Sequence, residues 1–128
     1  MKKNNIIFWV STTLIFLMEG VIPALSFQTE LAKEGTRHLQ YPAYFSNALV
    51  VFKVLGALVL IIPQMPKFVK EWAYAGLSFV FIFASISHFS IDGFGFQGIL
   101  PLIFLAILAV SYVYYHKKQV ETNLQSAA

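Results

Sequence analysis

The strongest constraint on this chain is a stretch without Lys, Arg, Asp or Glu that runs from Trp72 to Ile91. At about 1.5 Å rise per residue, a helix of this length crosses a hydrocarbon core about 30 Å thick. Polar residues recur every seven positions in and beside the stretch, at Glu71, Ser78, Ser85 and Asp92. Seven residues are close to two helical turns, so these four share one face of the helix. A membrane helix turns such a polar face toward other helices, so the stretch predicts one member of a transmembrane bundle.

The composition extends this interpretation to the whole chain of 128 residues, of which 58% are hydrophobic and 12% charged. Soluble domains average about 25% charged residues, so an ordinary soluble domain is excluded. The hydropathy pattern predicts an all-α integral membrane four-helix bundle, with helices at about residues 6–25, 44–62, 72–91 and 98–115. Residues 1–118 would form this single domain, and residues 119–128 a flexible polar tail.

The first apolar segment has two interpretations. Lys2 and Lys3, the apolar run from Ile6 and the small residues near Ser26 fit a cleaved secretory signal peptide. A retained helix is favoured, because the apolar run reaches full spanning length with only Glu19 as an interruption. Pro23 is expected to kink or end this helix. The polar connection over residues 27–43 fits either a short interfacial helix or a solvated loop.

The distribution of basic residues predicts the orientation in the membrane. Only Lys33 and Arg37 would lie on one side of the membrane. The other side would carry six lysines, namely Lys2, Lys3, Lys67, Lys70, Lys117 and Lys118. The side richer in lysine is expected to be cytoplasmic, which places both termini inside. We therefore expect a multi-pass membrane protein in contact with the lipid bilayer, with both termini in the cytoplasm. The net charge of +3 does not predict nucleic-acid binding, since the cations sit at helix ends.

Three ionisable residues fall inside the predicted helices, and they define a candidate site. Helix rise places Glu19 about 20 Å, Lys53 about 16 Å and His88 about 24 Å from the inner edge of the hydrocarbon core. A charge at the membrane centre costs about 2.5–3.5 kcal/mol on insertion scales, so the cheaper arrangement is an inward-facing Glu19–Lys53 pair. His88 would lie close to this pair, with Asp92 one turn further along. The supporting polar stripe consists of Thr12, Ser78 and Ser85.

The candidate site has a functional and a structural interpretation. Glu19, Lys53, His88 and Asp92 would form a polar pocket that moves a proton or holds a polar head group. Alternatively, the ion pair only determines which helices touch, and His88 is hydrogen-bonded to a neighbour. The catalytic residues are unknown, because no phosphate loop, serine-nucleophile elbow or two-metal carboxylate pattern occurs. No metal site is expected, and the absence of cysteine excludes thiol chemistry carried by this chain alone.

Several segments resemble the DoxX-like family of small bacterial membrane proteins. The resemblance runs from about Ile6 to Lys118 and rests mainly on KVLGALVLIIPQMPKFVKEWAYAG, from Lys53 to Gly76. Three other segments contribute, namely YPAYF, ASISHFSIDG and ILPLIFLAILAVSY. The resemblance implies a four-helix membrane bundle, located in the bacterial inner (cytoplasmic) membrane. It also implies an association with thiosulfate–quinone oxidoreduction and membrane redox complexes, although no catalytic motif transfers residue by residue.

Three functions from different classes remain open. The first is a subunit of a membrane redox system that binds a quinone-like lipophile and works with a membrane or soluble redox partner. The second is a non-catalytic scaffold or assembly factor. The third is a small proton-linked transporter, which would need a homo-oligomer, because four helices without a repeat do not build a pathway.

Overall fold

The computed structural model describes residues 2–26 and 29–127, and 89% of it is helical. No strand occurs among these residues, which confirms the predicted all-α class. In chain order the elements are α1 (Lys2–Phe16), the π-helical segment η1 (Leu17–Val21), α2 (Ile22–Ser26), α3 (Glu30–His38), α4 (Ala43–Ile61), α5 (Lys67–Asp92) and α6 (Phe96–Ala127).

Four spans are long and apolar enough to cross a membrane, as the hydropathy pattern predicted. They are Lys2–Ser26, which combines α1, η1 and α2, and the helices Ala43–Ile61, Lys67–Asp92 and Phe96–Ala127. Many large apolar side chains on these helices are exposed, for example Phe52, Phe79 and Phe83. In a membrane this surface contacts lipid tails, so its exposure is expected of a multi-pass protein.

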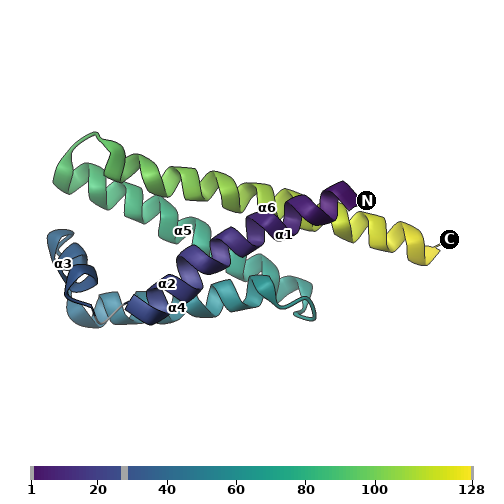
Figure 1. The fold of residues 1–128 in the computed structure, drawn as a ribbon, viewed down its shortest axis with the longest axis horizontal. Helices are drawn as coiled ribbons and strands as arrows, with labels where there is room; N and C mark the ends of the chain where they lie inside the picture. The colour runs from purple at the N-terminus through teal and green to yellow at the C-terminus, as the bar shows by residue number, and fades with distance from the viewer. Residues whose placement is uncertain (1, 27–28, 128) are drawn as a thin grey trace.

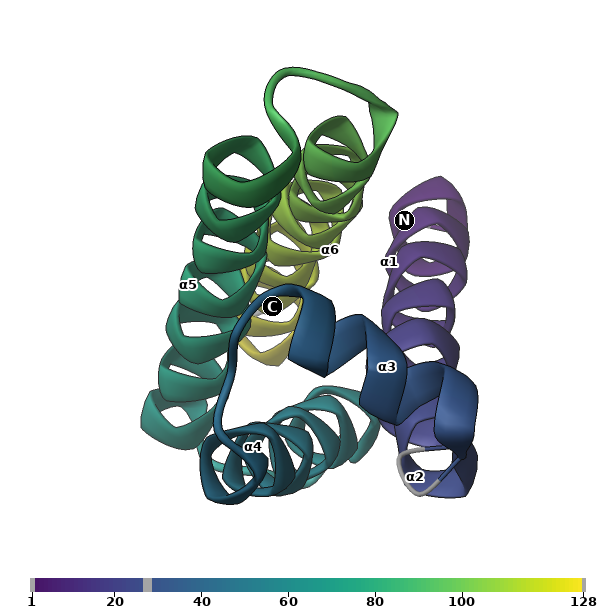
Figure 2. The same ribbon diagram turned by 90° about the vertical axis from the view of Figure 1, so that its left-hand side faces the viewer.

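The four spans run back and forth, so both termini lie at the same end as the α4–α5 turn (Figure 1). A view along the bundle shows α6 between α5 and α1, with α4 completing the ring and α3 crossing in front (Figure 2). The contacts agree, because α6 packs against α1 and α5, while α4 packs against α5 and the first span. The core between them contains Phe8, Ile15, Leu60, Tyr74, Leu77, Phe81, Leu108 and Tyr115.

The helix ends follow from proline, glycine and one lysine. Pro42 and Pro66 are the N-caps of α4 and α5, and Gly93 is the C-cap of α5, where its positive φ of 77° suits a residue without Cβ. Lys70 is buried and its Nζ donates a 2.8 Å hydrogen bond to the carbonyl of Leu60, near the last turn of α4. A cation there stabilises the negative end of the helix dipole.

The first span changes its helical geometry around Glu19. The Ile22 N–H bonds to the carbonyl of Leu17, five residues back, which makes η1 a π-helical turn. Pro23 has no N–H to give to the carbonyl of Glu19, so the α-helical ladder cannot continue unchanged through this point. The helix nevertheless resumes as α2, and the predicted effect of Pro23 is therefore a local change of geometry rather than an end.

The last helix differs from the sequence prediction at both ends. It begins at Phe96 rather than near Gly98, and it continues to Ala127 where a loose tail from residue 119 was expected. After Pro101 the helix contains neither Gly nor Pro, and its polar end is rich in residues of good helix propensity. Near this end, the side chain of Asn4 donates a 2.6 Å hydrogen bond to Glu121, which ties α6 to α1.

Candidate functional site

An ion pair joins the first span to α4 inside the bundle. The Nζ of Lys53 lies 3.0 Å from Oε2 of Glu19, and the two side chains are 21% and 7% exposed. The distance agrees with the pair predicted from helix depth. Glu19 belongs to η1, so the π-helical turn contributes the acidic member of the pair. Such turns are frequent at functional sites, because they redirect side chains within a helix.

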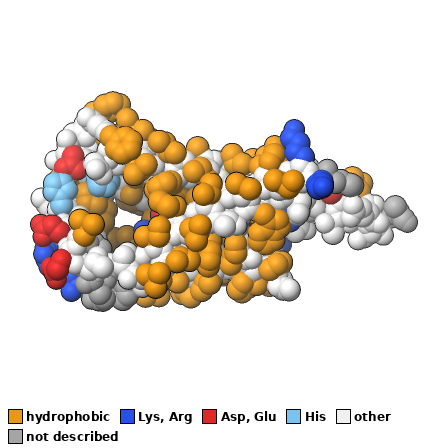
Figure 3. Space-filling view, viewed as in Figure 1, with side chains coloured by type: hydrophobic (Ala, Val, Ile, Leu, Met, Phe, Trp, Pro, Cys, Tyr) orange, Lys and Arg blue, Asp and Glu red, His pale blue; other side chains and the backbone are white. Residues whose placement is uncertain are grey.

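Close backbone packing holds the two members together. A Cβ placed on Gly20 would lie 3.0 Å from the Cβ of Ala57, so the small residue allows η1 to approach α4 directly beside Glu19. Helices in lipid associate through such close contacts between small residues, since the hydrophobic effect does not drive them together there. The space-filling view shows a hollow beside α3, between α5 and α4, with basic and acidic atoms at its inner edge (Figure 3).

A second polar cluster lies at the end of the bundle opposite the termini. Asp92, the last residue of α5, binds two histidines: Nδ1 of His88 lies 3.3 Å from Oδ2, and Nε2 of His38 pairs with Oδ1. His38 is the last residue of α3, so this cluster joins the connecting helix to α5. The hydroxyls of Tyr41 and Ser87 share a further hydrogen bond between the same two regions.

The four predicted site residues thus form two pairs rather than one connected group. No ion pair or hydrogen bond among the described parts of the chain links His88 or Asp92 to Glu19 or Lys53. The acceptor for His88 is the carboxylate four residues along its own helix, as the spacing allows. His38 was not predicted in the site, because a histidine in a polar connection carries no indication of the helix on which it docks.

The supporting stripe is divided between packing and backbone contacts. Thr12 is fully buried and shares a 2.6 Å hydrogen bond with Ser111, whose hydroxyl also lies 2.7 Å from that of Tyr74. Ser78 donates to the carbonyl of Tyr74 in its own helix. Ser85 is buried, and its hydroxyl has no hydrogen-bond partner in residues 2–26 and 29–127.

The donor groups do not form a metal centre in the part of the chain that the structure describes. No group of three or more His, Asp or Glu side chains there is arranged to hold a metal ion. His38, His88 and Asp92 approach one another, but they do so through hydrogen bonds between the carboxylate and the rings. Both polar clusters, the Glu19–Lys53 pair and Asp92 with its two histidines, can bind polar groups through hydrogen bonds and charge.

Comparison with known proteins gives one match. The model of the DoxX-like family matches residues 7–111, which cover all four candidate membrane spans in whole or in part. No curated protein matches the chain. No solved structure matches it either.

Proposed function

Since this chain belongs to the DoxX-like family, we propose that it is a membrane subunit of a redox system and binds a quinone-like lipophile at Glu19 and Lys53. It is a multi-pass protein with four apolar helices that contact the bilayer. The observation that carries the proposal is the ion pair between Glu19 and Lys53, at 3.0 Å in the interior of the bundle.

The donor capacity of Lys53 favours a ligand with carbonyl oxygens. An ammonium group has three N–H donors, and among the described residues its one charged partner is Glu19. The remaining donors are available to an acceptor that enters from the apolar surroundings, and the side chain is 21% exposed. A quinone offers two carbonyl oxygens on an apolar ring, which match a charged donor inside a lipophilic site.

The electrons would pass to or from a partner protein. The chain contains no cysteine, so it supplies no thiol relay of its own. A membrane or soluble redox partner, or a second copy of this chain, would complete the system.

We place the protein in the bacterial inner membrane with both termini cytoplasmic, as the lysines near the α4–α5 turn and the two termini favour. The burial of Phe8 and Ile15 in the core supports a retained first helix.

The test is mass spectrometry of the small molecules that copurify with the protein. We expect a stoichiometric quinone or similar lipophile in the wild type and in Lys67→Met, which removes an exposed lysine at the start of α5. The ligand should be lost in Lys53→Met. An equal amount of ligand in Lys53→Met and the wild type would refute the proposed site.

A double variant separates binding from scaffolding. Glu19→Gln combined with Lys53→Met removes both charges and should fold, because no unpaired charge remains. If the pair binds the ligand, this variant stays empty and inactive in a redox assay with its partner. If the pair only fixes helix contacts, the double variant regains the function that either single variant loses.

A further inference from the structure

A third polar cluster joins α5 to α6 and is separate both from Glu19 and Lys53 and from the cluster around Asp92. The carboxylate of Glu71 receives a 2.9 Å hydrogen bond from the hydroxyl of Tyr112 at Oε2, and Nε2 of His116 lies 2.9 Å from Oε1. The Glu71 side chain is 32% exposed. A carboxylate has about four lone-pair positions, so these two partners leave acceptor capacity on both oxygens.

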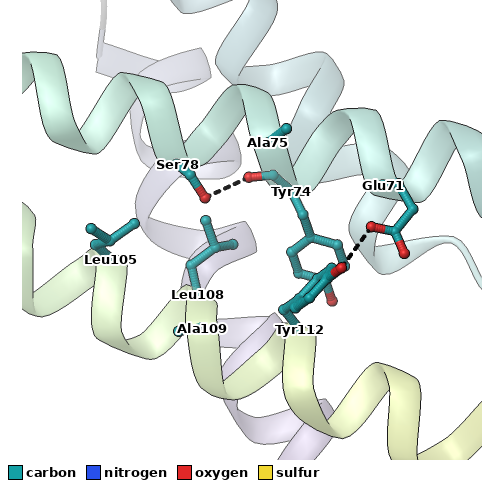
Figure 4. Close-up of a pocket in the computed structure, with 8 residues that line it drawn as sticks. All are labelled: Glu71, Tyr74, Ala75, Ser78, Leu105, Leu108, Ala109 and Tyr112. Atoms are coloured by element: carbon teal, nitrogen blue, oxygen red, sulfur yellow. Dashed lines mark hydrogen bonds between the residues drawn. The ribbon is translucent and has the colours of Figure 1, made fainter.

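The cluster borders a cavity of about 260 Å³ between α5 and α6. Glu71 and Tyr112 lie at one end of it, and Ser78 and Leu105 lie toward the other (Figure 4). The rest of the wall is apolar and includes the ring of Tyr74, which meets the ring of Tyr112 edge to face at 5.1 Å between centroids. A mostly apolar cavity with a few convergent polar groups is the usual form of a small-molecule site.

Small residues open this cavity to the surface of the bundle. Ala75 of α5 and Ala109 of α6 are both exposed and both line it. The inner wall is closed, because Tyr74 and Leu108 belong to the core. Tyr74 also donates or accepts in the buried bond with Ser111, so its hydroxyl is committed to the interior rather than to the cavity. The polar end of the cavity is therefore the carboxylate of Glu71 with Tyr112.

We infer that the α5–α6 cavity binds a small, mostly apolar ring compound that carries a hydroxyl group. The ring packs between the aromatic and aliphatic walls, and the hydroxyl donates a hydrogen bond to Glu71. A compound of the same shape without the O–H leaves the free acceptor positions of Glu71 unpaired, so it binds more weakly. The cavity is near the lower limit of ligand sites in volume, which restricts it to a small molecule or one end of a larger one.

The test uses the full chain in lipid nanodiscs and two probes of nearly equal shape, 2-naphthol and 2-methoxynaphthalene. Binding is measured by equilibrium dialysis, with protein-free nanodiscs subtracted. We expect one saturable site per chain for 2-naphthol, with an affinity about tenfold higher than that of the methyl ether. Equal affinities would overturn the inference, because they would mean that the Glu71 carboxylate does not accept a hydrogen bond from the hydroxyl of the probe.

Matched alanines in α6 locate the site. Ala109→Leu fills the cavity and should weaken 2-naphthol binding about tenfold or more. Ala106→Leu adds the same side chain at an exposed position outside the cavity lining, and should leave binding unchanged. Glu71→Ala should abolish the preference for the hydroxyl probe. Equal effects of the two leucine variants, or a preference that persists in Glu71→Ala, would also overturn the inference.

Discussion

Thr12 and Ser111, which are 99 residues apart in the chain, share a buried hydrogen bond of 2.6 Å. The hydroxyl of Tyr74 joins the same serine at 2.7 Å, so one small side chain connects α1, α5 and α6. Helices in lipid gain little from apolar burial, and interhelical hydrogen bonds then contribute to their register. We regard this triad as the contact that fixes how the three helices meet.

Removing the central hydroxyl should be costly. Ser111→Ala leaves both Thr12 and Tyr74 without this partner, and we expect the free energy of unfolding to fall by about 1–2 kcal/mol. Tyr74→Phe should cost less, because the bond between Thr12 and Ser111 remains. Reversible unfolding in mixed micelles measures both. Ser78→Ala is the control, since its hydroxyl donates to the Tyr74 carbonyl within its own helix; an equal loss there would contradict the role of the triad.

The ion pair should behave as a coupled unit. Lys53→Met leaves the carboxylate of Glu19 unpaired in the interior, and we expect a loss of about 3 kcal/mol in unfolding free energy. Glu19→Gln should cost a similar amount by leaving Lys53 unpaired. The double variant should return to within about 1 kcal/mol of the wild type. A double-mutant cycle gives the coupling, and simple addition of the single losses would show that the residues act independently.

The contact between Gly20 and α4 should not tolerate a methyl group. Gly20→Ala would bring its new Cβ to 3.0 Å from the Cβ of Ala57, which is fixed to its backbone. We expect overpacking to destabilise the protein by about 1–3 kcal/mol.

Gly76→Ala is the matched control for this prediction. Among the described residues, no atom outside the adjoining backbone of α5 lies within 4 Å of a Cβ added there. Alanine should therefore stabilise α5 by about 0.5–1 kcal/mol through its higher helix propensity. Thermal unfolding compares the two variants, and similar shifts in Tm would show that the space beside Gly20 is not limiting.

The connecting helix α3 should depend on Asp92 for its position. Asp92→Ala removes the acceptor of His38, so we expect faster amide hydrogen exchange over residues 30–38. Glu34→Ala serves for comparison, because Glu34 pairs with Arg37 inside α3. Unchanged exchange in Asp92→Ala would show that the contact with His38 does not hold the helix.

The proposed orientation can be tested on a chain that has no native cysteine. Ser126→Cys lies on the terminal part of α6, and Gly35→Cys lies on α3, where a new side chain meets open space. In intact cells a membrane-impermeant maleimide should label Gly35→Cys and not Ser126→Cys. The reverse pattern would invert the proposed topology.

The fold class could be predicted from the sequence because spanning length and hydropathy are local properties. Each apolar segment shows by itself that it can cross a bilayer, since its backbone must satisfy its own hydrogen bonds there. The proximity of Glu19 and Lys53 was also accessible, because two opposite charges at similar depth are costly apart. The helical conformation of residues 119–127 could not be predicted, because their polar composition fits both a loose tail and an extended helix.

Tertiary structure alone decided which faces of the helices meet. Ser111 stands in an apolar run, and nothing local distinguishes a serine that faces lipid from one that joins Thr12 and Tyr74. The docking of His38 on Asp92 and the cavity beside Glu71 likewise depend on pairs of elements distant in the chain. The sequence pattern indicates how deep each residue lies in the membrane and which residues share a helix face. The rotation of each helix and its neighbours are set by the packing of all four spans together.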